Sequence, residues 1–224
     1  MISPVSENTL LVTLADEVRA DLPLKLQYLC QQLRAQNWFW LQDLVPSYTT
    51  LLIVYDADHL DFRQAAAAVR PLVARCLDHT TSDLPAKALE LPVYYSEESG
   101  PDLVGLADAC SLSVDEVIAK HPATLYQVYA MGFAPGFGFM GEVDPAIAHP
   151  RRETPRQRVP QGSVGIANRQ TAVYPVSSPG GWQIIGRCPT RLFDREKLSL
   201  LSIGDQVRFY SVGREQYLSL GGTL

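Results

Sequence analysis

Three stretches decide the fold of this chain: GFAPGFGFMG at residues 132–141, PRRETPRQRVPQGSVGI at residues 150–166, and VYPVSSPGGWQIIG at residues 173–186. Repeated Gly and Pro exclude one long helix, because both residues interrupt helical hydrogen bonding. The aromatic and apolar residues between them exclude a disordered linker. The stretches therefore predict short strands joined by shaped turns, a type of surface on which ligand sites are often built.

Short strands with frequent turns continue around these stretches. We expect strands at residues 157–160, 163–166, 172–176, 183–187 and 206–211. The last of them follows a turn at Gly204 and Asp205. Regular short strands of this kind favour a closed or nearly closed β-barrel.

Two short helices are expected before the first stretch, at residues 102–109 and 113–121. Ser113 is a predicted N-cap for the second helix, with Glu116 three positions further on. The spacing is similar to that of a helix-turn-helix, but neither helix has a basic face for DNA. An insertion that packs on the β domain is therefore the favoured interpretation.

The N-terminal part has a different pattern, in which strands alternate with amphipathic helices. Residues 21–36 place Leu22, Leu26, Leu29 and Leu33 on one helical face. The expected order is a strand at 8–14, a helix at 21–36, strands at 38–45 and 49–55, a helix at 62–77 and a strand at 88–95. This β-α-β-β-α-β order is the split βαβ arrangement.

The composition becomes linker-like at residues 82–85, and we place the domain boundary there. The prediction is an α/β N-terminal domain at residues 1–84 and a β-barrel domain at residues 85–224. The fold class that follows is α+β.

The bulk numbers narrow the possible partners. A chain of 224 residues with 46% hydrophobic residues and a net charge of -5 has an ordinary globular composition. The negative charge argues against nucleic-acid and anionic-membrane partners, which need clustered cations. The four widely spaced cysteines form no metal-ligand pattern and are expected to be reduced core thiols. We see no signal peptide and no apolar run of membrane-spanning length, so a cytoplasmic location is expected.

Together the three stretches resemble the family of the 5-oxoprolinase B subunit, also called the KipI or allophanate hydrolase subunit 1 family. PSYTTLLIV at residues 46–54 is similar to a strand of the same family. The resemblance implies a small α/β domain followed by a cyclophilin-like β-barrel of the carboxyltransferase-domain type. It also implies a heteromeric complex with 5-oxoprolinase subunits A and C, one of them a related barrel. Such a complex opens 5-oxo-L-proline to L-glutamate at the expense of ATP.

The resemblance leaves two further functions open. One branch of the family inhibits a sporulation histidine kinase, and a docking surface for a kinase needs no sequence signature. Other relatives form part of urea amidolyases. An allophanate- or urea-linked role is less favoured for a free-standing chain.

We expect lactam opening with ATP to begin by phosphorylating the amide oxygen, so the site needs cations near phosphoryl oxygens. Guanidinium groups bind phosphate or carboxylate bidentately. Arg152 and Arg156 lie in the family motif PRRxxPR and are the predicted catalytic pair, and Arg158 is a predicted binding residue. In an extended segment these three share one side and Arg151 takes the other. Salt bridges on a loop are the alternative for each of them.

His121, at the end of a predicted helix, is the candidate general acid or base, because its ordinary pKa lies near working pH. The family resemblance also matches this position. The alternative is a structural role, in which the ring interacts with the exposed carbonyls at the helix end.

Residues 160–165, PQGSVG, predict a small anion nest, with Gln161, Gly162 and Ser163 as binding residues. The family usually has Ala where Gln161 stands. Tyr174 is a predicted ligand contact, since a phenol packs on a small ring and also forms a hydrogen bond. The chain has no GxxxxGK[ST] motif, so ATP is expected to be bound in another way, such as across a subunit interface. No metal ligands are predicted, and a divalent metal accompanying the nucleotide is left open.

Overall fold

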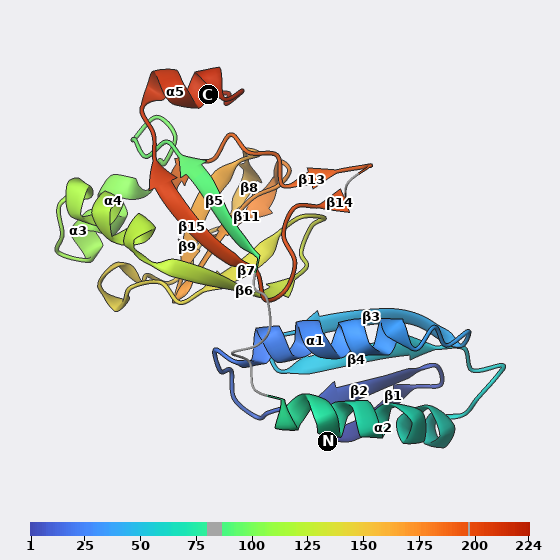
Figure 1. The fold of residues 1–224 in the computed structure, drawn as a ribbon. Coiled ribbons are helices and arrows are strands. Elements are labelled where there is room, and N and C mark those ends of the chain that lie inside the picture. Colours follow the sequence, from blue (N-terminus) through green and yellow to red (C-terminus); the bar gives the residue numbers. More distant parts are fainter. Residues whose placement is uncertain (80–86, 197) are drawn as a thin grey trace. The chain divides into compact units, whose positions relative to one another are not determined.

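The structure is a computed structural model that describes residues 1–79, 87–196 and 198–224 (Figure 1). The chain divides into two compact units, Met1–Ala86 and Lys87–Leu224. The predicted boundary between residues 84 and 85 lies outside the described residues and stays a prediction. Helices and strands occur in both units, which confirms the α+β class.

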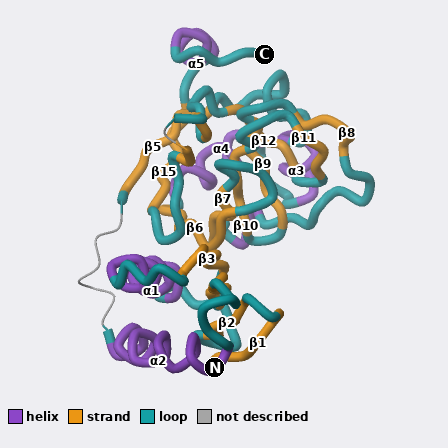
Figure 2. The backbone as a smooth tube through the Cα atoms, turned by 90° about the vertical axis from the view of Figure 1, so that its right-hand side faces the viewer, coloured by secondary structure: helices purple, strands orange, loops and turns teal. Residues whose placement is uncertain are grey.

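The first unit is a layer of strands covered by two helices. Its elements are β1 (Ile2–Ser6), β2 (Thr9–Thr13), α1 (Leu22–Ala35), β3 (Leu41–Ser47), β4 (Thr50–Tyr55) and α2 (Phe62–Asp78). The strands pair antiparallel in the order β1-β2-β4-β3. Both helices lie on one face of these strands, as Figures 1 and 2 show from two directions.

The predicted leucine face of α1 is confirmed, because Leu22, Leu26, Leu29 and Leu33 have no exposed surface. Helix α2 begins with a capping box between Asp61 and Gln64. These local signals explain why both helices form where the sequence predicts them.

One predicted strand belongs elsewhere. Residues 88–95, expected to complete the split βαβ order, form β5 (Ala88–Val93), which pairs in parallel with β15 (Gln206–Ser211) of the second unit. Strand β1, which was not predicted from the sequence, forms a hairpin with β2 at one edge of this layer. The assignment of residues 88–95 to the N-terminal sheet was therefore wrong.

The second unit contains one main sheet, two separate pairs of strands, and helices. In chain order after β5 it has α3 (Leu103–Ala109), α4 (Val114–Ala123), β6 (Leu125–Met131), β7 (Gly138–Gly141), a 3-10 turn (Pro145–Ile147), β8 (Arg156–Val159), β9 (Ser163–Ala167), β10 (Gln170–Val173), β11 (Ser178–Gly180), β12 (Gln183–Arg187), β13 (Phe193–Asp194), β14 (Leu198–Ser199), β15 and α5 (Arg214–Ser219). The main sheet has the order β5-β15-β6-β7-β10-β9-β12. Separate pairs join β8 with β11 and β13 with β14.

The two ends of this main sheet meet at one point. Tyr94, directly after β5, exchanges two backbone hydrogen bonds of 2.9 Å with Arg187 at the end of β12. Within the described residues the end strands share only this bridge, so the sheet is nearly closed and not a fully paired barrel. Of the two forms expected from the sequence, a closed or a nearly closed barrel, the structure has the nearly closed one.

The two short helices pack on the sheet, as expected for an insertion. Helix α3 contacts β12 and helix α4 contacts β15. The predicted capping box of α4 is present, since Ser113 Oγ accepts from the Glu116 N–H and the Glu116 carboxylate accepts from the Ser113 N–H. Strand β9 lies in the middle of the core, and all five of its residues are buried.

A tight turn before β7 depends on Gly136. Its φ is +86°, in the left-handed region, and a Cβ built there would lie 2.8 Å from Phe193 Cβ. Glycine is therefore required at this position for both its backbone conformation and the close approach of the next segment.

Candidate active site

A buried carboxylate, Asp102, holds the two arginines that the sequence predicts to be catalytic. Asp102 is 6% exposed and immediately precedes α3. Its Oδ1 accepts hydrogen bonds from Arg152 Nη1 and Arg156 Nη2, both at 2.7 Å, and its Oδ2 accepts one from Arg156 Nη1 at 2.8 Å. The backbone N–H of Ile184, in β12, donates to Oδ2 at 2.7 Å. This carboxylate therefore ties α3, β8 and β12 together through charge-assisted hydrogen bonds.

The same contacts fix the turn that leads into β8. Arg152 also donates its backbone N–H to Gly181 O at 2.7 Å. The turn is thus held by one backbone bond and by two guanidinium groups on one carboxylate. Two cations on one anion leave an excess positive charge at this cluster.

The structure brings Arg152 and Arg156 together, but in the ion-pairing role that was the alternative expectation. Parity also placed Arg158 on their side, and this part of the prediction was wrong. Arg158 lies apart from them and donates its Nε–H to Ser177 Oγ at 3.2 Å. The predicted phosphate contacts of these arginines stay predictions.

A small pocket adjoins this turn. It has a volume of about 210 Å³. Its lining consists of five aromatic side chains, one arginine and two glycines: Phe133, Phe137, Phe139, Arg151, Tyr174, Gly180, Gly181 and Trp182. We call this set the aromatic pocket. It contains Tyr174, the side chain that the sequence predicts to face a ligand.

Edge-to-face contacts between rings build the wall of the aromatic pocket. The ring of Phe137 lies 5.4 Å from that of Tyr174 and 5.7 Å from that of Trp182, between centroids, with interplanar angles of 82° and 86°. These are favourable geometries for aromatic pairs. Phe137, Tyr174 and Trp182 are buried, and burial raises the pKa of the Tyr174 phenol. The phenol therefore stays protonated near neutral pH and offers a hydroxyl donor.

Phe133 differs from the other rings because it is exposed. Its side chain is 62% exposed although its ring centroid lies 5.1 Å from that of Phe137. Its φ is +68°, a conformation that is uncommon for a bulky residue and costs roughly 1 kcal/mol or more. Strain of this kind is typical of positions where a side chain serves a site.

Arg151 completes the lining with a positive charge. Its Cζ lies 5.9 Å from the centre of the Trp182 ring, within cation–π range. Among the described residues no carboxylate lies within salt-bridge distance of Arg151, in contrast to Arg152 and Arg156. Arg151 and Arg152 both precede β8, so the parity argument, which assumed an extended segment, does not apply to this pair.

The predicted anion nest is not formed by residues 160–165. The Gly162 N–H donates to Tyr174 O at 2.8 Å, and the Ser163 N–H donates to Pro160 O at 3.2 Å. Both N–H groups are therefore used inside the fold. Gly162 has φ +82°, and a Cβ there would overlap Cys188 O, so this glycine serves the turn. Gln161 is exposed.

Ser163 is fully buried, and its hydroxyl has no hydrogen-bond partner in the described residues. A hydroxyl without exposed surface is not placed to contact a ligand from solution. The structure therefore does not support the binding role predicted for Ser163.

His121 lies in the core, with no exposed surface. Thr171 Oγ1 donates its proton to Gly165 O at 3.0 Å and must therefore accept from His121 Nε2–H, at 2.9 Å. His121 Nδ1 then accepts from the Tyr95 hydroxyl at 2.7 Å. Burial lowers the pKa of His121 to about 3, so the ring is neutral at physiological pH. This geometry supports a structural role in place of the predicted general acid or base, and the ring does not bond the helix-end carbonyls.

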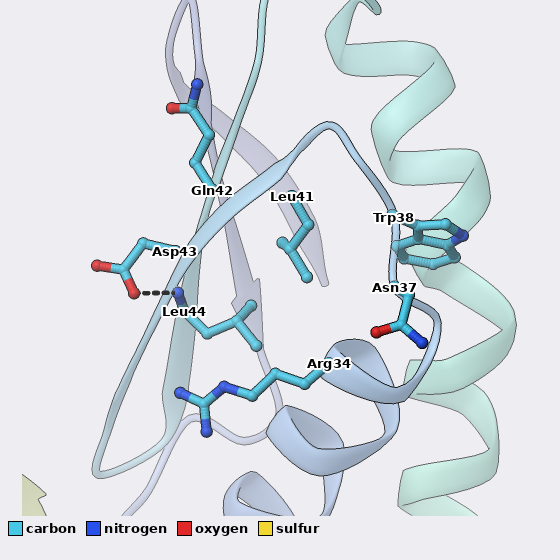
Figure 3. Close-up of a pocket in the computed structure, with 7 residues that line it drawn as sticks. All are labelled: Arg34, Asn37, Trp38, Leu41, Gln42, Asp43 and Leu44. Carbon is cyan, nitrogen blue, oxygen red and sulfur yellow. Dashed lines mark hydrogen bonds between the residues drawn. The ribbon is translucent and has the colours of Figure 1, made fainter.

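A second pocket, of about 240 Å³, lies in the first unit between the end of α1 and β3 (Figure 3). Arg34, Asn37, Trp38, Leu41, Gln42, Asp43 and Leu44 line it. The Asp43 carboxylate accepts from the Leu44 N–H at 2.7 Å, as the dashed line in Figure 3 shows, and so serves its own strand. None of the lining residues belongs to the three stretches at residues 132–141, 150–166 and 173–186, so we favour the aromatic pocket as the candidate site.

Within the described residues no group of three or more His, Cys, Asp or Glu side chains is placed to hold a metal ion. The four cysteines are free thiols. None of the described helices has the length and apolar character that crossing a membrane requires.

Sequence reasoning missed Asp102 and Phe133, and it named Arg151 without choosing it for the site. In the sequence, Asp102 stands out only as the start of a helix. No local signal shows that it meets arginines fifty residues further along the chain. For Phe133 the available signal is its place next to Gly132 in a glycine-rich turn.

Known proteins are similar to this chain along nearly its whole length. The family described as "Carboxyltransferase domain, subdomain C and D" matches residues 1–201. A protein named as the B subunit of 5-oxoprolinase, from Bacillus subtilis (strain 168), is 33% identical over 228 residues, which cover 96% of this chain and 94% of that protein. Its namesake from Haemophilus influenzae is 34% identical over 218 residues, covering 96% and 99%.

A solved structure gives the same result for the fold. The crystal structure of TTHA0988 aligns with a TM-score of 0.76 at 35% identity, over 92% of this chain and 40% of that longer chain. Since the family match spans most of the sequence and two relatives align over nearly their full length, the chain belongs to the family of the 5-oxoprolinase B subunit.

Proposed function

We propose that this chain is the B subunit of an ATP-dependent 5-oxoprolinase complex, which converts 5-oxo-L-proline and water into L-glutamate while ATP is hydrolysed to ADP and phosphate. One observation carries the proposal. All residues that line the aromatic pocket come from the three stretches at residues 132–141, 150–166 and 173–186. The stretches that carry the family resemblance are thus the ones that build the pocket.

In this proposal the chain supplies part of a shared site. The aromatic pocket offers rings, a phenol hydroxyl and a cation. It contains no serine, cysteine or carboxylate among its lining residues that would attack the lactam carbonyl. We therefore propose that subunits A and C complete the site, one of them as a related barrel subunit, and that the isolated chain is inactive.

Most of the residues that the sequence predicts for phosphate binding already have partners within the described part of the fold. The N–H groups of Gly162 and Ser163 are used within the turn, and Arg152 and Arg156 are held on Asp102. We propose that ATP is bound mainly by the partner subunits. Dependence on ATP accords with the cytoplasmic location expected from the sequence.

Arg152 and Arg156 have two proposed effects that an experiment can separate. As positioning residues, they hold the turn that carries Arg151. Through the excess positive charge of the cluster, they also stabilise anions formed during the reaction. Loss of the first effect lowers the stability of the protein together with its activity, whereas loss of the second lowers kcat at unchanged stability.

The test is reconstitution with the partner subunits. We expect glutamate and ADP to form from 5-oxo-L-proline and ATP only when all subunits are present. The double variant Arg152→Ala with Arg156→Ala should lose most of this activity, whereas Arg191→Gln, which changes an arginine with 73% side-chain exposure, should keep it. A complex that forms no glutamate, combined with inhibition of histidine-kinase autophosphorylation by the chain alone, would replace the proposal with the kinase-inhibitor function.

A further inference from the structure

We infer that the aromatic pocket binds the five-membered lactam ring of 5-oxo-L-proline, with Arg151 binding the carboxylate of the same molecule. The choice of this lactam rests on the proposed function. The class of ligand, a small flat ring with one negative charge, follows from the residues of the pocket.

The size of the pocket sets the first limit on its ligand. Sites for drug-sized molecules have volumes of roughly 300–1,000 Å³. The aromatic pocket, at about 210 Å³, is smaller than this range and suits a single ring with one substituent. A nucleotide, with its base, sugar and phosphates, does not fit in this volume.

The walls set the second limit. Phe137, Tyr174 and Trp182 present ring edges and faces that are held by their mutual edge-to-face contacts. A flat ring packs well against such surfaces. The Tyr174 hydroxyl, protonated at neutral pH like other phenols, can donate a hydrogen bond to a lactam carbonyl. Glycine is needed at position 180 for this arrangement, because the Tyr174 hydroxyl packs so closely against its backbone that a Cβ would overlap the Tyr174 oxygen.

Charge sets the third limit. Arg151 is the only charged residue in the lining, and among the described residues no carboxylate neutralises it. Its neighbour Arg152 is fixed on Asp102 and bonded through its backbone to Gly181, so the main chain beside Arg151 is held in place. A guanidinium presented in this way is suited to a carboxylate.

Phe133 gives the pocket a rim. The residue is exposed and has a positive φ, yet its ring stays close to those of Phe137 and Tyr174. A ring at the rim covers one face of a bound ligand and excludes water from it. Phe133 is therefore expected to contribute to ring binding, separately from the charge of Arg151.

The experiment measures binding to the full chain by NMR, with the Trp182 indole signal as the reporter. Three probes separate the ring from the charge: 5-oxo-L-proline has both, 2-pyrrolidinone has only the ring, and acetate has only the carboxylate. The variants are Arg151→Gln and Phe133→Gly, and the matched control is Arg191→Gln, because Arg191 is exposed and lies outside the pocket.

We expect 5-oxo-L-proline to shift the Trp182 signal in the wild-type chain. Arg151→Gln should weaken this binding by about tenfold, as for the loss of a hydrogen bond to a charged group, and should leave 2-pyrrolidinone binding unchanged. Phe133→Gly should weaken both ring ligands. Equal affinity of 5-oxo-L-proline for the wild type and Arg151→Gln, or shifts at Trp38 and Trp40 instead of Trp182, would overturn the inference.

Kinetics of the assembled complex distinguish this inference from the proposed function. An Arg151→Gln complex with a raised KM for 5-oxo-L-proline supports both. A complex that turns over with a wild-type KM despite Arg151→Gln overturns the pocket assignment and leaves the proposed function standing. A complex without turnover, made with a chain that still binds 5-oxo-L-proline through Arg151, supports the pocket and overturns the proposed function.

Discussion

Replacing Asp102 with Asn tests whether this carboxylate organises the candidate site. Asparagine has nearly the same shape, so the change removes the charge and leaves two guanidinium groups without their counter-ion. Removing one partner of a buried ion pair costs roughly 3–5 kcal/mol. The side chains of Arg152 and Arg156 are 37% and 23% exposed, and water therefore stabilises part of the unpaired charge. We expect the free energy of unfolding to fall by about 2–3 kcal/mol.

The assay is urea unfolding followed through the NMR signal of Trp182, which reports on the second unit. Glu142→Gln is the matched control, because Glu142 and Arg169 form an ion pair with the same 2.7 Å separation on the surface. With side chains 53% and 54% exposed, this pair should contribute less than about 1 kcal/mol. The comparison separates the effect of burial from the effect of distance.

A double-mutant cycle completes the test. In a background of Arg152→Met and Arg156→Met, Asp102→Asn should cost clearly less, because no cation is left without a partner. If Asp102→Asn costs no more than Glu142→Gln, or costs the same with and without the arginines, the electrostatic account of this cluster is refuted.

Three further predictions concern the interior of the protein. The folded pKa of His121, about 3, lies below its ordinary value, so the unfolded chain binds more protons than the folded one between these values; the free energy of unfolding should therefore fall by about 1.4 kcal/mol per pH unit as the pH drops below roughly 6.5. In urea titrations at pH 7 and pH 5, His121→Asn should remove this loss of stability. An unchanged pH dependence in this variant would contradict the prediction. Gly136→Ala should lower the free energy of unfolding by about 1–3 kcal/mol because of its φ of +86°, whereas Gly105→Ala, inside α3 with open space around its Cβ, should raise it by about 0.5–1 kcal/mol. Ser163→Ala should leave thermal stability and the activity of the complex unchanged, because the Ser163 hydroxyl has no partner among the described residues. Thr171→Val should lower the free energy of unfolding by about 1–3 kcal/mol, because it leaves His121 Nε2 without its partner. Loss of activity in Ser163→Ala would show that its hydroxyl takes part in the reaction.

Local chemistry explains which elements are predictable from the sequence. The capping residues Ser113 and Glu116, and the leucines on one face of α1, act within a few positions of the chain, so their patterns are legible without a fold. The short strands between residues 157 and 211 are predictable for the same reason, because the turn residues that bound them also act locally. The predicted helices and strands were therefore largely found where they were expected.

Long-range pairing explains the errors. Strand β5 follows the N-terminal domain in the sequence and so looks like the next strand of its sheet. Its hydrogen-bonding partner β15, however, is the last strand in the sequence of the second unit. Asp102 likewise finds Arg152 and Arg156 only through the fold. The residue type of His121 favours catalysis, and its burial becomes visible only from the packing around it.

The parallel pairing of β5 with β15 has a consequence for the order in which the second unit forms. Leu89 pairs with Val207 and Leu91 with Phe209, so the first strand of the unit to leave the ribosome pairs along its length with one of the last. Contacts between residues so far apart in the chain slow folding, because a long loop must close before they form. During synthesis, β5 must therefore wait for nearly the whole unit, and its apolar residues are exposed to chaperones or to aggregation until β15 arrives.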